Sequence, residues 1–363
     1  MVEYFTYLTN DCNLHCLYCS VLVDCKKNNL PMKMDYSIDT YLAFIEKTQI
    51  ASGDDELSIY LFGGEPSLEY TMASQVVKAV RDRLGAKYKS HFVLHTNGLL
   101  LGEIPSDLAE ILSLVMLSIN YDKIPKYNLA QGYFKTIIEN TILMKRSYGI
   151  PVIARLTATE TTSLYTEVMQ LHHFFDLVYW QIENSKSFDD YEAYYQTYTY
   201  EIGLLYKIWL QYFESGTMLK LAPFMAVVKF MFFHDRSDKE FSCGYGRGMV
   251  YIQTDGSCYA CSDSVENKTH FIGDLENGVK LGGHSLDKYR CSKCEYRPLC
   301  MGRCARIHLE YDNNRISEYC KLNQFMFNLF LSDKNKLSEI LVKYPYYENE
   351  LSSRLLEFTE FTP

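Results

Sequence analysis

The sequence lacks three features that would each indicate a large class of proteins. It has no excess of positive charge, because 36 lysine and arginine residues face 45 aspartate and glutamate residues, giving a formal net charge of −9. This balance argues against non-specific nucleic-acid binding. It has no recognisable signal peptide, since Glu3 comes early and no apolar segment follows. Its most apolar stretch, residues 221–233, is too short to span a bilayer and contains Lys229. We therefore expect a cytoplasmic protein without nucleic-acid or membrane partners.

Cysteine is absent from the long central part of the chain. Four of the 12 cysteines lie within residues 12–25 and eight lie within residues 243–320. Disulfides are not expected, because the cytosol keeps thiols reduced. Cysteines that serve only as small core residues would be scattered, whereas these are grouped. The grouping predicts metal or iron–sulfur ligation in two regions.

The apolar pattern predicts an α/β fold. The chain has 363 residues, 47% of them hydrophobic, which is enough for about two domains with a sizeable core. Short apolar segments alternate with helical stripes, and a repeated order of strand then helix implies parallel strands with right-handed crossovers. Six strands are fewer than the eight of a full barrel, so we predict a partial (β/α)6 barrel over residues 1–185. The expected strands are Glu3–Thr9, Leu57–Phe62, His91–His95, Leu114–Ile119, Pro151–Thr157 and Leu177–Ile182.

Three further regions follow the predicted barrel. Residues 186–239 are rich in tyrosine and read as a helical bridge. Residues 240–333 form a small cysteine-rich domain with one expected hairpin, MVYIQTDGSCYAC, that turns at Asp255 and Gly256. Residues 334–363 are expected to form a C-terminal helix and tail.

Polar residues stand at the end of every predicted strand. Because the carboxyl ends of parallel strands share one edge, these residues predict a ring of functional groups around one opening. In chain order they are Cys12, Cys16 and Cys19; Gly63, Gly64, Glu65 and Pro66; Thr96 and Asn97; Ser118 and Asn120; Arg155; and Gln181, Glu183 and Asn184.

The loop after the first strand holds three cysteines, Cys12, Cys16 and Cys19. Three thiolates can hold three irons of a 4Fe–4S cluster and leave the fourth iron open to a substrate or cofactor. The alternatives are a zinc site completed by His15 or Cys25, or plain buried thiols.

These residues resemble the signature of the radical S-adenosylmethionine (radical SAM) superfamily. The stretch CNLHCLYC includes the aromatic Tyr18 before the last cysteine. Gly63-Gly64-Glu65-Pro66 resembles the glycine-rich motif that contacts the methionine amino group of S-adenosylmethionine. The resemblance further implies cofactor contacts by Thr96, Asn97, Ser118, Asn120 and Arg155, with Arg155 on the methionine carboxylate. The stretch LSIN departs from the usual pattern, since Asn120 stands where an aspartate is common.

The second cysteine group resembles the SPASM extension of peptide-modifying radical enzymes. The resemblance implies two auxiliary 4Fe–4S clusters, so that the chain would hold three in all. Cys291, Cys294, Cys300 and Cys320 would ligate one of them, and Cys243, Cys261 and Cys304 the other. Either Cys258 completes the latter set, which we favour, or one iron stays open. A pair of zinc sites is the alternative for this region.

The resemblance implies an oxidoreductase that cleaves S-adenosylmethionine to a 5′-deoxyadenosyl radical and oxidises a peptide or protein side chain. We expect maturation of a ribosomally made peptide through a thioether, a carbon–carbon cross-link or a related bond. Glu183, Asp263 and Tyr251 are candidate catalytic residues.

Partners and alternatives follow from the same resemblance. We expect a peptide or protein substrate and an external electron donor of flavodoxin or ferredoxin type. Since the first strand starts at residue 3, we expect either a separate leader-binding protein or direct binding of the core peptide. One alternative is an anaerobic sulfatase-maturating enzyme that forms formylglycine, although Ser262 rather than an aspartate follows Cys261. An alternative of another class is a non-catalytic iron–sulfur electron carrier.

Overall fold

A computed structural model describes residues 1–363 apart from 15, 17, 18, 20, 22–27, 120–129, 185, 186, 234–240, 263–267, 283 and 284. The chain forms two compact units. The first comprises Met1–Val152 and Gly246–Gly283, and the second comprises Ile153–Tyr245 and His284–Pro363. The domain boundaries expected from the sequence stay a prediction.

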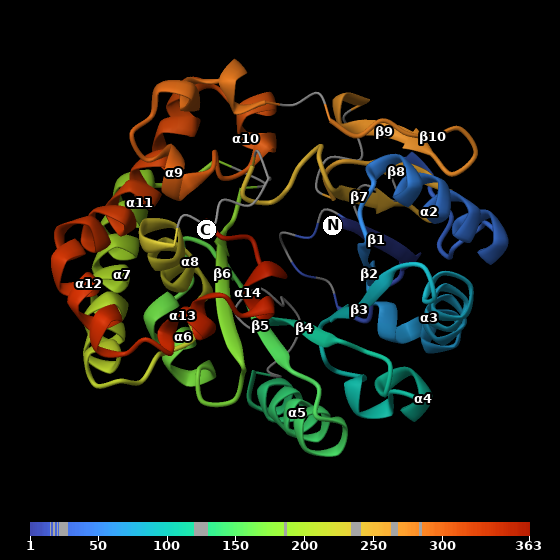
Figure 1. The fold of residues 1–363 in the computed structure, drawn as a ribbon, viewed down its shortest axis with the longest axis horizontal. Coiled ribbons are helices and arrows are strands. Elements are labelled where there is room, and N and C mark those ends of the chain that lie inside the picture. The colour runs from blue at the N-terminus through green and yellow to red at the C-terminus, as the bar shows by residue number, and fades with distance from the viewer. Residues whose placement is uncertain are drawn as a thin grey trace. The chain divides into compact units, whose positions relative to one another are not determined.

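The first unit is built on a sheet whose strands follow the order β10-β9-β8-β7-β1-β2-β3-β4 (Figure 1). Strands β1 to β4 are parallel to their neighbours, and β7 also pairs in parallel with β1. Strands β8, β9 and β10 continue the sheet as antiparallel pairs. The strands are β1 (Val2–Thr9), β2 (Glu56–Gly63), β3 (Lys89–Thr96), β4 (Leu114–Ile119), β7 (Met249–Ile252), β8 (Ser257–Tyr259), β9 (Phe271–Asp274) and β10 (Gly278–Val279).

Helix α2 of the first unit begins at a side-chain cap. The side chain of Ser37 caps α2 by accepting a hydrogen bond from the Thr40 N–H. Tyr4 and Thr6 of β1 point toward α2, where they bond Gln49 and Tyr41. Since side chains alternate along a strand, the odd-numbered residues of β1 line the opposite face. The helical elements are α2 (Ile38–Ser52), η1 (Pro66–Glu69), α3 (Tyr70–Leu84), η2 (Leu101–Glu103), α4 (Ser106–Ala109), α5 (Ala130–Leu143), the π-helical η4 (Met144–Tyr148) and η5 (Lys268–His270).

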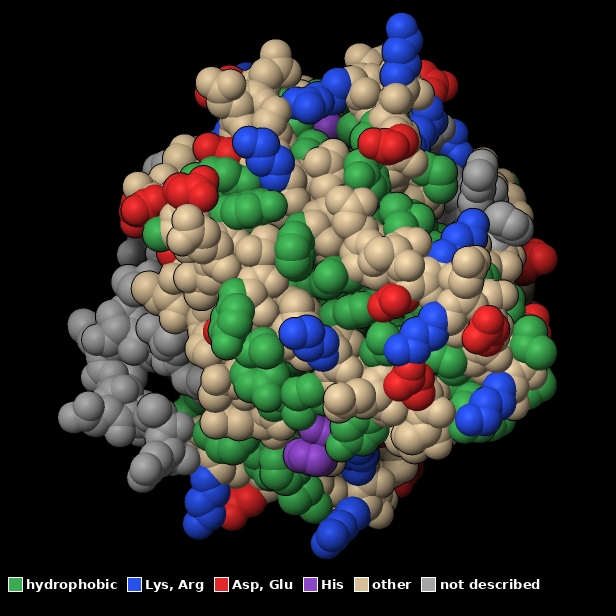
Figure 2. All heavy atoms as spheres, turned by 90° about the vertical axis from the view of Figure 1, so that its left-hand side faces the viewer, with side chains coloured by type: hydrophobic (Ala, Val, Ile, Leu, Met, Phe, Trp, Pro, Cys, Tyr) green, Lys and Arg blue, Asp and Glu red, His purple; other side chains and the backbone are tan. Residues whose placement is uncertain are grey.

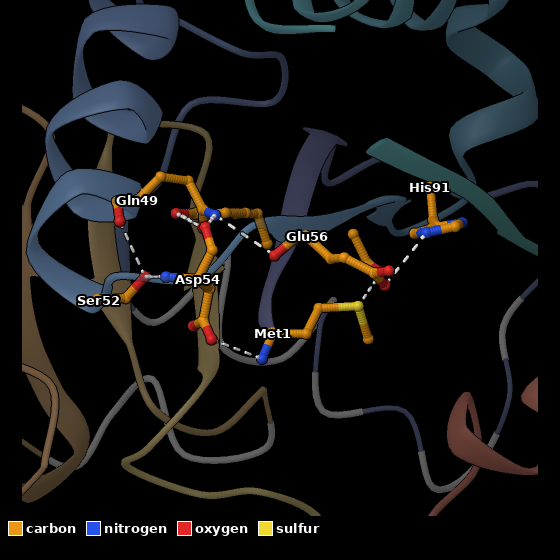
Figure 3. A network of polar contacts seen from close by, with 8 residues as sticks. Met1, Gln49, Ser52, Asp54, Glu56 and His91 are labelled. Atoms are coloured by element: carbon orange, nitrogen blue, oxygen red, sulfur yellow. Dashed lines mark hydrogen bonds and ion pairs between the residues drawn. The ribbon is translucent and has the colours of Figure 1, made fainter. Parts of the chain in front are cut away.

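A polar network fixes the amino-terminal edge of this sheet (Figure 3). The Met1 ammonium lies 3.1 Å from a carboxylate oxygen of Asp54. The Gln49 amide donates to the carbonyls of Asp54 and Glu56, at 3.0 and 3.3 Å. His91 Nε2 lies 3.6 Å from Glu56 Oε2. Because functional residues of parallel β/α folds gather at the carboxyl ends of the strands, we assign this network to stability.

The second unit contains one parallel strand pair, β5 (Val152–Ala158, whose first residue belongs to the first unit) and β6 (Leu177–Ile182). Its two long helices, α7 and α11, pack side by side (Figure 1). Trp180 of β6 packs edge-on against Phe224 of α8. The helical elements are α6 (Leu164–Leu171), α7 (Tyr191–Glu214), α8 (Ala222–Phe232), η6 (Leu286–Lys288), η7 (Arg290–Lys293), α9 (Arg297–Cys300), α10 (Ala305–Glu310), α11 (Asn313–Ser332), α12 (Lys334–Lys343), α13 (Tyr347–Leu351) and α14 (Arg354–Glu357).

The predicted α/β fold with parallel strands and a cysteine-rich C-terminal region is confirmed. The face over α7, α11 and α12 carries acidic and basic side chains interspersed with hydrophobic ones (Figure 2). None of the helices in the described residues combines the length and apolar composition that a membrane span requires.

Candidate active site and metal centres

The three-cysteine loop of the first unit follows β1 directly. Asn10 is buried and fixes the start of the loop, since its side-chain amide donates to the Pro31 carbonyl at 2.9 Å and to the Thr254 hydroxyl at 2.8 Å. The Asp11 carboxylate then accepts from the Cys12 N–H at 2.9 Å. Sequence reasoning did not single out Asn10, because an asparagine after a strand is also typical of ordinary turns.

Cys12, Cys16 and Cys19 lie close enough to interact electrostatically. Burial is the main cause that raises the pKa of the Cys12 thiol to about 12, and the charges of Glu65, Cys19 and Cys16 raise it further. Such a group of thiols resists ionisation unless a cation compensates, and a bound metal deprotonates a coordinating thiol outright. The role of these three cysteines as cluster ligands stays a prediction.

Gly63 and Gly64 bring the end of β2 against the end of β1. The Gly64 N–H donates to the Thr9 carbonyl and the Glu65 N–H to the Asp11 carbonyl, both at 2.8 Å. A Cβ at Gly63 would lie 2.2 Å from the Thr9 oxygen, and one at Gly64 would lie 2.2 Å from the Asp11 oxygen. Gly63 also has a φ of 130°, which L-residues rarely adopt. Only glycine fits here, and the backbone beside the cysteine loop stays bare.

The Glu65 carboxylate turns into the protein. It is buried and accepts hydrogen bonds from the Ser67 N–H at 3.0 Å, the Thr96 hydroxyl at 2.6 Å and the Asn97 N–H at 2.8 Å. Burial raises the pKa of this carboxyl, and these hydrogen bonds lower it. The side chain thus joins the end of β2 to the end of β3.

The ends of β3 and β4 add further polar groups of the first unit. The Asn97 side chain donates to Asn13 at 2.7 Å, which connects the third strand end to the cysteine loop. Ser118 Oγ lies 3.0 Å from His95 Nε2, and the His95 ring lies 4.9 Å from that of Phe62. The structure thus brings Ser118 and Asn97 to neighbouring strand ends. Sequence reasoning missed His95. Its ring lies next to that of Phe62 on the neighbouring strand β2.

An aromatic stack lines the same face of the sheet. Phe5 of β1 stacks between Tyr60 of β2 and Tyr251 of β7, with ring centroids 4.1 and 4.4 Å away. Tyr251, proposed as a catalytic candidate, is therefore packed in this stack and only 7% exposed. Its place on β7 is a packing position next to the candidate site.

The second unit gathers four cysteines. Among the causes that raise the pKa of Cys300, burial is the largest, followed by the charges of Cys320, Cys291 and Cys294. The Cys294 N–H donates to the Cys291 carbonyl at 3.2 Å, in the turn that spaces this C-x2-C pair. The role of Cys291, Cys294, Cys300 and Cys320 as ligands of one auxiliary cluster stays a prediction.

Cys243 and Cys304 form a separate pair in the second unit. Burial raises the pKa of the Cys243 thiol most, followed by the charges of Glu360 and Cys304. The Asn184 side chain lies 3.5 Å from the Cys304 sulfur. Their role as ligands of a second cluster stays a prediction, and Cys261 belongs to the first unit.

The turn from Cys300 to Cys304 has an unusual backbone. Met301, Gly302 and Arg303 have φ values of 47°, 67° and 54°. Non-glycine residues in the left-handed region cost about 1–2 kcal/mol each. The turn is held in place because the Arg303 N–H donates to the Cys300 carbonyl at 3.0 Å and the Ser242 hydroxyl donates to the Arg303 carbonyl at 3.0 Å. Sequence reasoning did not select Arg303, although a charged residue inside C-x3-C is a visible signal.

Cys258 lies in a different environment from these groups. It is fully buried in the first unit, and its thiol lies 3.6 Å from the Gly256 carbonyl. Burial is the largest cause of the raised pKa of its thiol. After burial, the charge of Cys258 also raises the pKa values of Tyr36 and Tyr41. The role of Cys258 as a cluster ligand stays a prediction.

The remaining predicted site residues fall in the second unit or outside the described residues. Arg155 donates to the Tyr179 hydroxyl at 3.0 Å and to the Gln181 side chain. The Glu183 carbonyl accepts from the Tyr319 hydroxyl at 2.9 Å. Tyr18, Asn120 and Asp263 lie outside the described residues, as do His15 and Cys25. No group of three or more His, Cys, Asp or Glu that could hold a metal ion is found among the residues that the structure describes.

Comparison with known proteins gives a family match in the N-terminal part of the chain. Residues 6–170 match the family model of the radical SAM superfamily. A search of curated proteins gave no match.

The fold resembles several solved structures. The structure of native anSMEcpe with bound AdoMet superposes with a TM-score of 0.72 and 18% sequence identity, covering 94% of this chain and 100% of that chain. Native anSMEcpe with bound AdoMet and Cp18Cys peptide gives 0.70 and 18%, covering 94% and 99%. Streptococcus suis SuiB bound to S-adenosylmethionine gives 0.53 and 14%, covering 86% and 77%. These likenesses concern the fold, and they extend over the cysteine-rich region as well as the β/α region.

Proposed function

We propose that this chain, which carries a radical SAM domain, is an enzyme that oxidises a side chain of a peptide or protein. A 4Fe–4S cluster and S-adenosylmethionine, when bound, supply a reductive cleavage that yields a 5′-deoxyadenosyl radical. Cys12, Cys16 and Cys19 would hold the cluster.

One observation carries the proposal: the three thiols lie beside a backbone segment that admits no Cβ. Gly63 and Gly64 let the end of β2 approach the backbone that leads into the cysteine loop, because an added Cβ would meet the Thr9 or Asp11 oxygen at 2.2 Å. Glu65 holds that segment to the end of β3 through Thr96 and Asn97. A glycine segment beside a three-cysteine loop resembles the arrangement in the radical SAM family, which supports a cofactor site there.

The peptide substrate is supported by the structures that share this fold. Two of them are native anSMEcpe with bound AdoMet and a peptide, at 18% and 17% identity. We favour a thioether, carbon–carbon or related bond in a ribosomally made peptide. Formylglycine formation in a sulfatase is compatible with the same likeness and is the second candidate.

We further propose that the second unit contributes to two auxiliary clusters. Cys291, Cys294, Cys300 and Cys320 would hold one of them. Cys243 and Cys304 would hold the other together with Cys261 and, in the version we favour, Cys258. The electrostatic interactions within each second-unit set support this division.

Anaerobic reconstitution tests the proposal. Reconstituted protein should contain roughly 8–12 irons per chain and, with S-adenosylmethionine and a strong reductant, should release 5′-deoxyadenosine. The Cys16→Ala variant should release none. Cofactor cleavage that persists in this variant would contradict the assignment of the loop. Treatment with a hydrazide followed by mass spectrometry then separates the substrate candidates: a cross-linked peptide has lost two hydrogens and does not react, whereas a sulfatase peptide reacts at its formylglycine aldehyde.

A further inference from the structure

Four rings surround the side chain of Phe62 near the end of β2. The rings of Phe5 and Tyr7 lie edge-on to it, with centroids 5.6 and 5.0 Å away. The Tyr251 ring also lies edge-on, at 6.1 Å, and the tilted His95 ring lies at 4.9 Å. Edge-to-face contacts at these distances are favourable, so they hold the Phe62 ring in one orientation.

Phe62 and His95 differ from the rest of this aromatic cluster in burial. Phe5, Tyr7 and Tyr251 are buried, with at most 8% of their surface exposed. Phe62 and His95 are only half-buried. Within the cluster, the two rings that keep exposed area therefore lie near the carboxyl ends of two neighbouring strands.

The two rings share one face of the sheet. Tyr60 of β2 pairs with Val93 of β3. Phe62 and His95 each follow by two residues and therefore lie on the same face. Met116 of β4 pairs with His95 and adds a buried thioether there. None of these side chains carries a carboxylate or an ammonium group, so the surface favours an uncharged ligand.

The His95 ring is also fixed from β4. Its Nε2 lies 3.0 Å from Ser118 Oγ, and this hydrogen bond restricts rotation of the imidazole. Phe62 and His95 are thus two planar rings whose orientations are set before any ligand arrives. Preorganisation of this kind lowers the entropic cost of binding.

Both rings adjoin the candidate cofactor site in the same unit. Phe62 directly precedes Gly63, which packs against the backbone leading into the cysteine loop. His95 directly precedes Thr96, whose hydroxyl donates to Glu65 at 2.6 Å. Ligands of parallel β/α folds bind at the carboxyl ends of the strands. A side chain resting on the two rings would therefore lie beside the predicted reaction centre.

We propose that Phe62 and His95 bind an aromatic side chain of the peptide substrate and thereby determine which peptides the enzyme accepts. The inference rests on the proposed function, because that function makes the ligand part of a peptide. An aromatic ring gains stacked or edge-to-face contacts on this surface in addition to its burial, and an aliphatic side chain gains burial alone.

The test measures binding of three probes to the reconstituted full chain without reductant, so that no turnover occurs. The probes are N-acetyl-tyrosinamide, N-acetyl-leucinamide and N-acetyl-lysinamide, and ligand-observed NMR titration gives their dissociation constants. The tyrosine probe should bind tightest, and Phe62→Leu should weaken its binding roughly fivefold. Phe271→Leu is the matched control, since Phe271 is an exposed aromatic residue of the same unit whose ring lies 5.6 Å from that of Tyr259. This variant should bind the tyrosine probe like the wild type.

His95→Gln is the second variant, because glutamine removes the ring but retains a group that can bond Ser118. It should also weaken the tyrosine probe, and urea midpoints show that each variant is folded. The proposal is overturned if the leucine or lysine probe binds as tightly as the tyrosine probe, or if His95→Gln binds that probe normally. Displacement of the tyrosine probe by S-adenosylhomocysteine would also overturn it, because the surface would then belong to the adenine of the cofactor.

Release of 5′-deoxyadenosine is a separate readout for the proposed function. A protein that prefers the tyrosine probe but releases none would contradict the radical chemistry and leave the binding surface in place. A protein that releases it without any preference among the probes would contradict the roles of Phe62 and His95 alone.

Discussion

The Glu65 carboxylate accepts the Asn97 N–H at 2.8 Å, which joins the end of β2 to the end of β3. The same carboxylate accepts from the Thr96 hydroxyl and the Ser67 N–H. Glu65→Gln would replace one carboxylate oxygen by an amide N–H₂, which would face either the two donors to Oε1 or the one donor to Oε2 in a buried site. We expect a loss of about 1–3 kcal/mol in the free energy of unfolding for each donor left unsatisfied. Urea unfolding of the apo protein measures it.

Glu69→Gln is the matched control for that change. Glu69 pairs with Lys33, whose side chain is 70% exposed. Exposed pairs contribute about 0–1 kcal/mol, so this variant should unfold close to wild type. Equal losses in the two variants would show that Glu65 is no more than an ordinary acidic residue.

Gly63→Ala should disturb the site more than any glycine change on the surface. The added Cβ would lie 2.2 Å from the Thr9 oxygen. The backbones of β1 and β2 cannot move apart to relieve this clash without breaking the hydrogen bond from the Gly64 N–H to the Thr9 carbonyl. We expect reduced stability and no measurable 5′-deoxyadenosine.

Gly132→Ala serves as the control for Gly63→Ala, since nothing lies within 4 Å of the added Cβ. Because alanine is favoured over glycine inside a helix by about 1 kcal/mol, this variant should be stable and active. Normal cofactor cleavage by Gly63→Ala would refute the assignment of the bare segment.

Ser118→Ala tests whether the β4 end belongs to the cofactor site. Its hydroxyl lies 3.0 Å from His95 Nε2 and is positioned at the strand end next to Asn97. Losing one hydrogen bond of about 1 kcal/mol should weaken S-adenosylmethionine binding roughly fivefold. Equilibrium binding to the reconstituted protein measures the change, and an unaltered affinity would remove Ser118 from the site.

The ion pair between Glu46 and Lys87 should give a pH-dependent contribution to stability. The hydrogen bond from Lys87 lowers the pKa of Glu46 below its usual value of 4.5. A carboxyl with a lowered folded-state pKa stabilises above its unfolded value, and the contribution is lost as the pH falls through the folded value. The urea midpoint of Glu46→Gln should therefore lie slightly below wild type at pH 7. The difference should vanish once the pH is well below 4.5, and a difference that persists there would contradict this origin.

The sequence predicts the local elements of this fold better than their partners. Leu114–Ile119 and Leu177–Ile182 appear as strands with the predicted bounds. The hairpin turn at Gly256 is also present, with a φ of 85°. That β7 would join the sheet beside β1 was not predicted, because the pairing links Glu3 to Met249, far apart in the chain.

In the candidate site, too, the sequence predicts local features better than the contacts between them. Motif spacing predicts Cys12, Gly63 and Thr96 as neighbours, since parallel strands end at one edge. It cannot predict that the Glu65 carboxylate turns inward, because that depends on which donors surround it. Nor can it predict the left-handed backbone of Arg303, which the surrounding contacts impose.

The most direct measurement of the central claim is the electron paramagnetic resonance spectrum of the reduced, reconstituted protein before and after S-adenosylmethionine is added. If Cys12, Cys16 and Cys19 leave one iron open to the cofactor, part of the wild-type signal should change on addition. The signal of Cys16→Ala should not change. A wild-type spectrum that S-adenosylmethionine leaves unaltered, in protein with its full iron content, would contradict the account and favour a non-catalytic electron carrier.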